Sequence, residues 1–115
     1  MKPDQHFWTL LDELVSQSEI QIDRPKGSAH PRYPQFIYPF DYGYLTNTTS
    51  SDGDGIDIWL GTLANKTPTG IVCTVDINKR DSEIKILLGC TSAEMHNIHA
   101  FHTADEQAGI LIERA

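Results

Sequence analysis

Cysteine, basic residues and long apolar runs are all scarce in this chain of 115 residues. Its two cysteines, Cys73 and Cys90, are too few for a small secreted fold stapled by disulfides, so we expect reduced thiols in the core. Even the longest apolar stretches, such as residues 84–88, fall far short of the roughly 20 residues that cross a bilayer. The sequence therefore predicts a protein without a membrane partner.

The shortage of basic residues also limits the possible partners. Nine Lys and Arg residues stand against sixteen Asp and Glu, which gives a formal net charge of −7. So negative a surface repels phosphate backbones, and we expect no nucleic-acid partner. A small anionic substrate remains compatible if metal cations lie between it and the carboxylates. Because the N-terminal residues lack the apolar core of a secretory signal, we expect a cytoplasmic location.

The length suits one domain with a small hydrophobic core, and we expect residues 1–115 to form it. Apolar residues at helical spacing predict a helix over residues 4–17, with Asp4 as its N-cap. Alternating patterns and turn residues predict short strands at residues 19–23, 43–45, 56–60, 71–75 and 84–88, a second helix over residues 92–103, and a closing apolar segment at 110–112. The proline-rich residues 25–39 predict an ordered loop or an edge. Because the strands are not separated by helices, we expect the α+β class with a small antiparallel sheet or barrel.

The acidic turn Asp52-Gly53-Asp54-Gly55-Ile56-Asp57 is the segment most suggestive of chemistry. Its three carboxylates repel one another unless water or a bound cation offsets their charge. Two glycines allow a tight turn, and oxygen ligands suit magnesium or manganese better than zinc. An ordinary solvated Asp-Gly turn explains these residues equally well when they are taken alone.

Two other motifs with a similar composition do not fit the acidic turn. An EF-hand loop that began at Asp52 would need an oxygen ligand at Ile56, glycine at Asp57 and an acid at Leu63. A phosphatase with a nucleophilic aspartate would place it after a buried apolar strand, whereas the polar residues 48–51 precede Asp52.

Three blocks in order along the chain resemble the soluble family I inorganic pyrophosphatases. They are Ile22-Asp23-Arg24-Pro25-Lys26-Gly27-Ser28, then Tyr38-Pro39-Phe40-Asp41-Tyr42-Gly43-Tyr44, and then Asp52-Gly53-Asp54-Gly55-Ile56-Asp57-Ile58. The third block resembles the family signature Asp-x-Asp-x-x-Asp. The resemblance implies a small five-stranded, mainly antiparallel β-barrel of OB-like form, with an N-terminal and a C-terminal helix. It also implies Mg²⁺ as cofactor, with Mn²⁺ as a possible substitute.

The same resemblance implies roles for individual side chains. Metal ligands would come from Asp52, Asp57 and Glu83, with Asp23 acting through metal-bound water and Asn78 at a further ligand position. Asp54 would orient or deprotonate the attacking water. Tyr42 and Lys85 would assist catalysis by contacting phosphate, and the phosphate-binding set would comprise Lys26, Arg32, Tyr42 and Lys85.

Several family features are missing from this chain. Only residues 28–37 stand where the family has a hairpin bearing cationic and acidic side chains, and residues 100–103 lack the family's late Tyr-Lys pair. The function that the resemblance implies is magnesium-dependent hydrolysis of pyrophosphate or a related small phosphoanhydride. The missing features leave two alternatives open. One alternative is a catalytically weak relative that binds metal or phosphate as a regulatory or interaction module. Another is a hydrolase of a bulkier organic diphosphate, and a homo-oligomer is compatible with each.

Three histidines, His96, His99 and His102, repeat every three residues on the predicted second helix. That spacing spreads them over one side of the helix. We expect a partly exposed helix face rather than a metal site, because metal-binding histidines on a helix favour a spacing of four.

Overall fold

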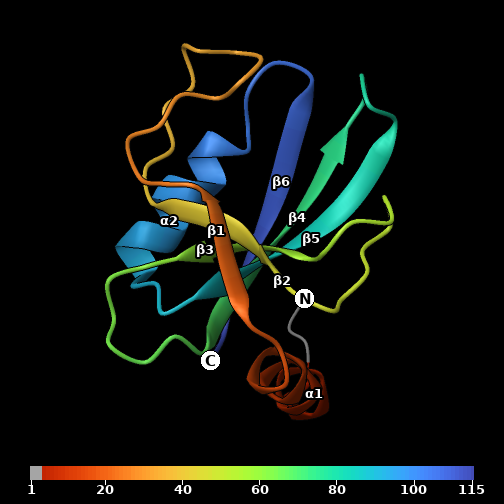
Figure 1. Ribbon diagram of the computed structural model, residues 1–115, viewed down its shortest axis with the longest axis vertical. Helices are drawn as coiled ribbons and strands as arrows, with labels where there is room; N and C mark the ends of the chain where they lie inside the picture. Colours follow the sequence, from red (N-terminus) through yellow and green to blue (C-terminus); the bar gives the residue numbers. More distant parts are fainter. Residues whose placement is uncertain (1–3) are drawn as a thin grey trace.

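The computed structural model describes residues 4–115, which form one twisted sheet with two helices (Figure 1). Its elements are α1 (Gln5–Ser16), β1 (Ile20–Arg24), β2 (Asp41–Leu45), β3 (Asp57–Leu60), β4 (Pro68–Asp76), β5 (Asp81–Leu88), α2 (Ser92–Phe101) and β6 (Gln107–Glu113). The two predicted helices and five predicted strands are present within a few residues of their expected bounds. Asp4 caps α1 as predicted, its carboxylate accepting a hydrogen bond from the backbone N–H of Phe7 at 3.0 Å.

The sheet is open and has six strands, in the order β1-β2-β3-β5-β4-β6. The α+β class is confirmed, but the expectation of a closed five-stranded barrel was wrong. Within residues 4–115 no strand pairing joins the edge strands β1 and β6. The extra strand is β6, which pairs antiparallel with β4 from Gly70↔Glu113 to Asp76↔Gln107. The sequence shows only three consecutive apolar residues there, and one of them, Ile110, is 66% exposed in this edge strand.

A parallel pairing between β3 and β5 organises the middle of the sheet. Ile58 lies opposite Ile86 and Trp59 opposite Leu87, whereas the other neighbouring strands run antiparallel. The start of β3 therefore lies beside the middle of β5. As a result, the acidic turn that precedes β3 is brought close to the polar residues of β5.

The two faces of the sheet are covered by different helices. On one face, Met95 and Ile98 of α2 join a core with Val72 and Leu87. On the other face, α1 contributes to a second core that includes Ile58, Ile71 and Ile86. Alternation along β4 and β5 sends adjacent residues to opposite cores, as expected for a sheet buried on both sides.

The pairing of β1 with β2 depends on a close approach at Gly43, which is opposite Ile22. A Cβ atom at Gly43 would lie 1.9 Å from the carbonyl oxygen of Gln21, so no larger residue fits without moving β1. This contact fixes the strand that ends with Asp23 and Arg24.

Residues 25–40 form the ordered loop that their prolines predicted. Backbone hydrogen bonds of 2.9 Å join Gly27 to Tyr38 and Tyr38 to Ser28, and Ala29 bridges to Ile37. The Tyr38 side chain is buried and anchors the loop to the core. No helix within residues 4–115 is both long and apolar enough to cross a membrane.

Candidate functional site: an acidic cavity around a buried lysine

The acidic turn and the sheet enclose a cavity of about 530 Å³. Its acidic side chains come from four segments: Asp23 from β1, Asp52 and Asp54 from the turn, Asp57 from β3 and Glu83 from β5. Tyr42 of β2 and Lys85 of β5 line the same space. Glu83 and Lys85 reach it together because residues two apart on a strand face the same side. The structure thus brings together seven of the residues that the resemblance had implied.

Lys85 lies at the centre of this cavity wall and is only 5% exposed. Its Nζ atom donates hydrogen bonds to Asp57 Oδ2 at 2.7 Å, to the Tyr42 hydroxyl at 3.0 Å and to Glu83 Oε1 at 3.3 Å. The Tyr42 hydroxyl donates in turn to Asp57 Oδ2 at 2.7 Å. Burial alone would lower the pKa of the Lys85 ammonium, but Tyr42 and Asp57 outweigh it and hold that pKa above its ordinary value. Lys85 is therefore a fixed positive charge.

Asp52 and Glu83 line the same cavity, and each affects the pKa of the other. The pKa of Asp52 is lowered, chiefly by the Ser50 hydroxyl and the backbone N–H of Asp54. The pKa of Glu83 is raised by burial and by the nearby negative charge of Asp57, despite the opposing effect of Lys85. Neighbouring carboxylates resist being ionised together. The five carboxylates that line the cavity outnumber its three cationic side chains, Lys85, Arg24 and Lys79, so the cavity keeps excess negative charge.

Carboxylate oxygens are the ligands that a hard divalent cation prefers, and the cavity offers several of them. Two of these carboxylates, Asp57 and Glu83, share the Lys85 ammonium. The arrangement of the carboxylates is not that of a completed metal site. Across residues 4–115, no group of three or more His, Cys, Asp or Glu side chains is placed to hold a metal ion. The Lys85 ammonium instead lies between the carboxylates of Asp57 and Glu83 and pairs with both. Ligation by these carboxylates therefore requires side-chain rearrangement.

Three residues implied by the resemblance are not brought to the acidic cavity. Arg32 and Asn78 line a neighbouring cavity instead. Lys26 lines neither of the two cavities, and its ammonium lies 5.6 Å from the centre of the Phe40 ring. Lys26 and Arg32 follow the path of the loop of residues 25–40, whereas Asn78 lies in the turn between β4 and β5.

Two cations of the cavity wall, Arg24 and Lys79, were not assigned a role from the sequence. The guanidinium of Arg24 lies 5.5 Å from the ring centre of Tyr38 and donates a hydrogen bond to its hydroxyl. Lys79 lies in the turn between β4 and β5. Arg24 belongs to the first of the three blocks that resemble the pyrophosphatases, so the sequence could have indicated that it lies at the site. Lys79 is a charged residue in a turn, and its residue type alone does not indicate a role.

An aromatic cluster supports the cavity from behind. The Tyr42 ring lies 4.8 Å from that of Trp59, and Trp59 Nε1 donates a hydrogen bond to His102 Nε2 at 3.0 Å. The expectation of an exposed histidine face was wrong for His102, which is only 4% exposed. The helix ends at Phe101, and His102, its C-cap residue, turns into the core. Burial lowers the pKa of His102 to about 3, which keeps the imidazole neutral.

Comparison with known proteins shows the family to which the chain belongs. The family model for inorganic pyrophosphatase matches residues 15–105, most of the chain, and this protein belongs to that family. Inorganic pyrophosphatase 2 of Pseudomonas syringae pv. tomato is 29% identical over 96 residues, covering 71% of this chain and 52% of that protein. Inorganic pyrophosphatase of Geobacillus stearothermophilus is 36% identical over 64 residues, covering 53% and 37% respectively. The matches thus span about half or less of these relatives.

Solved structures agree on the fold. An inorganic pyrophosphatase from Neisseria gonorrhoeae superposes with a TM-score of 0.61 at 19% identity, covering 77% of each chain. A structure titled inorganic phosphatase from Anaplasma phagocytophilum gives a TM-score of 0.57 at 15% identity, covering 82% of this chain and 81% of that one. The match to the family model ends at residue 105, before β6 begins, so the sixth strand lies outside the matched residues.

Proposed function

We propose that this protein hydrolyses inorganic pyrophosphate, or a closely related small phosphoanhydride, with the help of Mg²⁺ or Mn²⁺. One observation carries the proposal: around a single cavity, five carboxylates outnumber three cationic side chains, the buried Lys85 and the two at its edge, Arg24 and Lys79. A wall of this kind repels a phosphate unless cations intervene, and it contains the oxygen donors that attract such cations. Family membership supports the same reaction.

In this proposal Asp52, Asp57 and Glu83 hold divalent cations, with Asp23 acting through bound water. When bound, the cations supply charge neutralisation of the phosphates and polarisation of water. A divalent cation bound between Asp52 and Glu83 would also relieve the repulsion between these neighbouring carboxylates.

The remaining residues act on the substrate and on the attacking water. Asp54 accepts a proton from that water, whose oxygen bonds to one phosphorus while the bond from this phosphorus to the bridging oxygen breaks. Lys85 and Tyr42 exchange their hydrogen bonds to Asp57 for the phosphate, and they retain donors suited to its oxygens. The products are two phosphates, and the proton leaves with them or passes to solvent.

The direct test is release of inorganic phosphate from pyrophosphate, with and without Mg²⁺, by the native protein and by Asp54→Asn. We expect metal-dependent release that falls by about 100-fold or more in Asp54→Asn, the scale of a lost general base. Glu19→Gln is the matched control, because Glu19 is an exposed acid before β1, outside the cavity. Unchanged turnover in Asp54→Asn would contradict the assigned role.

The arrangement of Lys85 also favours a second candidate, a protein that binds metal or phosphate without rapid turnover. In that case the ion pair with Asp57 and the contact with Glu83 would persist, and the cavity would not assemble a full set of ligands. Calorimetry with Mg²⁺ and inorganic phosphate distinguishes the two. Binding without phosphate release from pyrophosphate supports this second candidate and excludes the first.

A further inference from the structure

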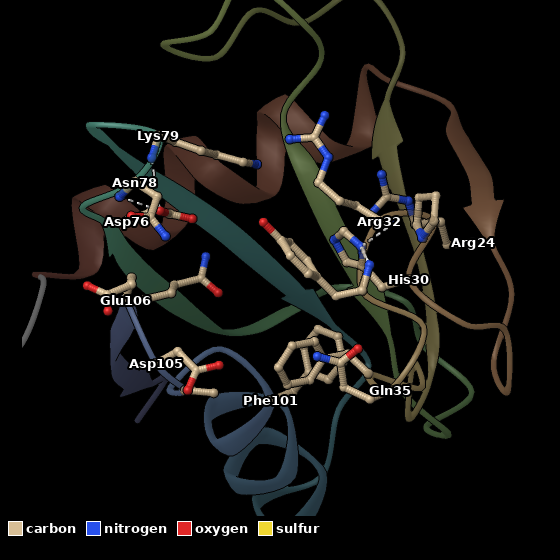
Figure 2. Close-up of a pocket in the computed structure, with 15 residues that line it drawn as sticks. Arg24, His30, Arg32, Gln35, Asp76, Asn78, Lys79, Phe101, Asp105 and Glu106 are labelled. Atoms are coloured by element: carbon tan, nitrogen blue, oxygen red, sulfur yellow. Dashed lines mark hydrogen bonds between the residues drawn. The ribbon is translucent and has the colours of Figure 1, made fainter.

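A second and larger cavity, of about 900 Å³, adjoins the acidic one (Figure 2). Figure 2 shows Arg24, Arg32 and His30 along one side, with Asp76, Asn78, Lys79 and Glu106 across from them and Phe101 between the two sides. Pockets that enclose whole organic molecules have volumes of roughly 300–1,000 Å³. The second cavity is therefore far larger than a pyrophosphate ion needs.

Two cations belong to both cavities. Arg24 and Lys79 line the acidic cavity and the larger one, so the two spaces meet at these side chains. The Arg24 guanidinium lies 5.5 Å from the ring centre of Tyr38 and 5.9 Å from that of Tyr42. Lys79 is exposed and forms no ion pair with any residue that the structure describes. A phosphate at this boundary would thus meet two available positive charges.

The larger cavity also has an aromatic lining that a phosphate does not need. The ring centres of Tyr33 and Phe36 lie 6.3 Å apart, and those of Phe36 and Phe101 are separated by the same distance. Tyr33 is 47% exposed, so part of its side chain can be reached from solvent. The backbone N–H groups of Arg32 and Tyr33 both donate to His30 Nδ1, at 3.1 and 3.2 Å, which fixes this part of the loop. Rings held in this way suit stacking against a flat organic group.

Charge is unevenly distributed around the larger cavity. Its acidic side chains come from the last residue of β4, Asp76, and from the turn before β6, Asp105 and Glu106. These acids disfavour a second phosphate there, and they offer acceptors for N–H and O–H groups. A bound molecule is therefore oriented with its phosphate at Arg24 and Lys79 and its neutral, ring-bearing part among the aromatic residues.

We infer that the substrate class includes organic diphosphates with an aromatic ring, such as nucleoside diphosphates, whose terminal phosphate enters the acidic cavity while the ring occupies the larger one. This inference rests on the proposed hydrolytic function. Water oxygen bonds to the terminal phosphorus, and the bond from that phosphorus to the bridging oxygen breaks. The electron pair leaves on the nucleoside monophosphate, and the proton passes through Asp54 to phosphate or solvent.

Binding of two non-cleavable analogues tests the inference without depending on turnover. The probes are α,β-methyleneadenosine diphosphate and methylenediphosphonate, titrated by calorimetry in Mg²⁺. We expect the adenosine analogue to bind at least 10-fold more tightly, although it carries less phosphate charge. Tyr33→Ala should remove most of this advantage and leave methylenediphosphonate binding unchanged, whereas Tyr33→Phe should keep it. Leu10→Ala is a control, because Leu10 is exposed on α1 and lines neither cavity.

The outcomes separate the two proposals. If pyrophosphate is hydrolysed but the adenosine analogue binds no more tightly than methylenediphosphonate, the organic substrate class is overturned and the proposed function stands. If the advantage persists in Tyr33→Ala, the ring does not use the larger cavity and the inference is likewise overturned. Failure of both analogues to bind, together with no phosphate release from pyrophosphate, removes the proposed function and this inference with it.

Discussion

The Nζ atom of Lys85 lies 2.7 Å from Oδ2 of Asp57, across the parallel pairing of β5 with β3. The Lys85 side chain is 7% exposed and that of Asp57 27%, so the pair is largely shielded from water. Buried pairs of this kind cost desolvation energy, and removal of one partner leaves the other charge uncompensated. The pair is therefore a sensitive point for both folding and activity.

Replacing Lys85 with Met should lower phosphate release from pyrophosphate by about 100-fold, the scale expected for one preorganised charge at a reacting phosphate. The change leaves Asp57 and Glu83 without their shared ammonium. Circular dichroism of the variant would show that the fold persists. Lys85→Arg keeps the positive charge and should lose less. Equal losses in the two variants would contradict an electrostatic role.

Replacing Tyr42 with Phe should reduce the free energy of unfolding by about 1–2 kcal/mol, because Asp57 loses a buried donor and Lys85 an acceptor. Urea denaturation measures the effect. Tyr44→Phe is the matched control, because no hydrogen bond of the Tyr44 hydroxyl is found among residues 4–115. Similar losses in both variants would show that the hydrogen bond to Asp57 contributes little.

The neutral His102 should make stability depend on pH. Its pKa is lowered to about 3 in the folded protein, whereas an unfolded histidine titrates near 6.5, so the unfolded chain binds the proton first as pH falls. The stability is full above about pH 6.5 and decreases as pH drops toward 3, with a loss of about 2 kcal/mol between pH 7 and 5.

Urea denaturation of native protein and His102→Gln at both pH values isolates this contribution. Glutamine retains an acceptor for Trp59 Nε1 and does not titrate, so the variant should lose less stability between pH 7 and 5. His96→Gln, at an exposed histidine, should behave like the native protein. A full pH dependence in His102→Gln would assign the effect to other groups.

Arg114 should contribute modestly to the attachment of α1. It donates to Asp12 with two hydrogen bonds, at 2.7 and 2.9 Å, and its guanidinium lies 5.4 Å from the centre of the Trp8 ring. The pair is partly exposed, so a double-mutant cycle with Arg114→Ala and Asp12→Ala should give a coupling energy of about 0.5–1 kcal/mol. Additive effects of the two changes would show that the ion pair adds no stability.

Much of this fold follows from local pattern. The helical spacing of α1, its Asp4 cap and the prolines of residues 25–39 each act over a few residues, so each could be predicted without knowing the rest. The order of the strands, and the fact that the sheet stays open, could not be predicted in this way. Both depend on how β6 pairs with β4 and on which strands remain edges, and these are long-range relationships that the spacing of apolar residues does not encode.

The site shows the same division. The acidic turn and Lys85 could be singled out because their residue types and order match a family pattern. The positions of Lys79 and Arg32 depend on the path of two loops, which residue types and their spacing do not encode. The buried environment of His102 likewise depends on where α2 ends against Trp59.

The parallel alignment of β3 with β5 also sets the order in which the protein acquires its cavity during folding. The hairpin of β4 and β5 joins neighbours in the chain, whereas Ile58 and Ile86 meet only after the intervening residues have formed a closed loop. Such distant pairings are slow compared with local ones. We therefore expect the acidic cavity to assemble late, so that a partially folded chain carries the hairpin before it can bind an anion or a cation.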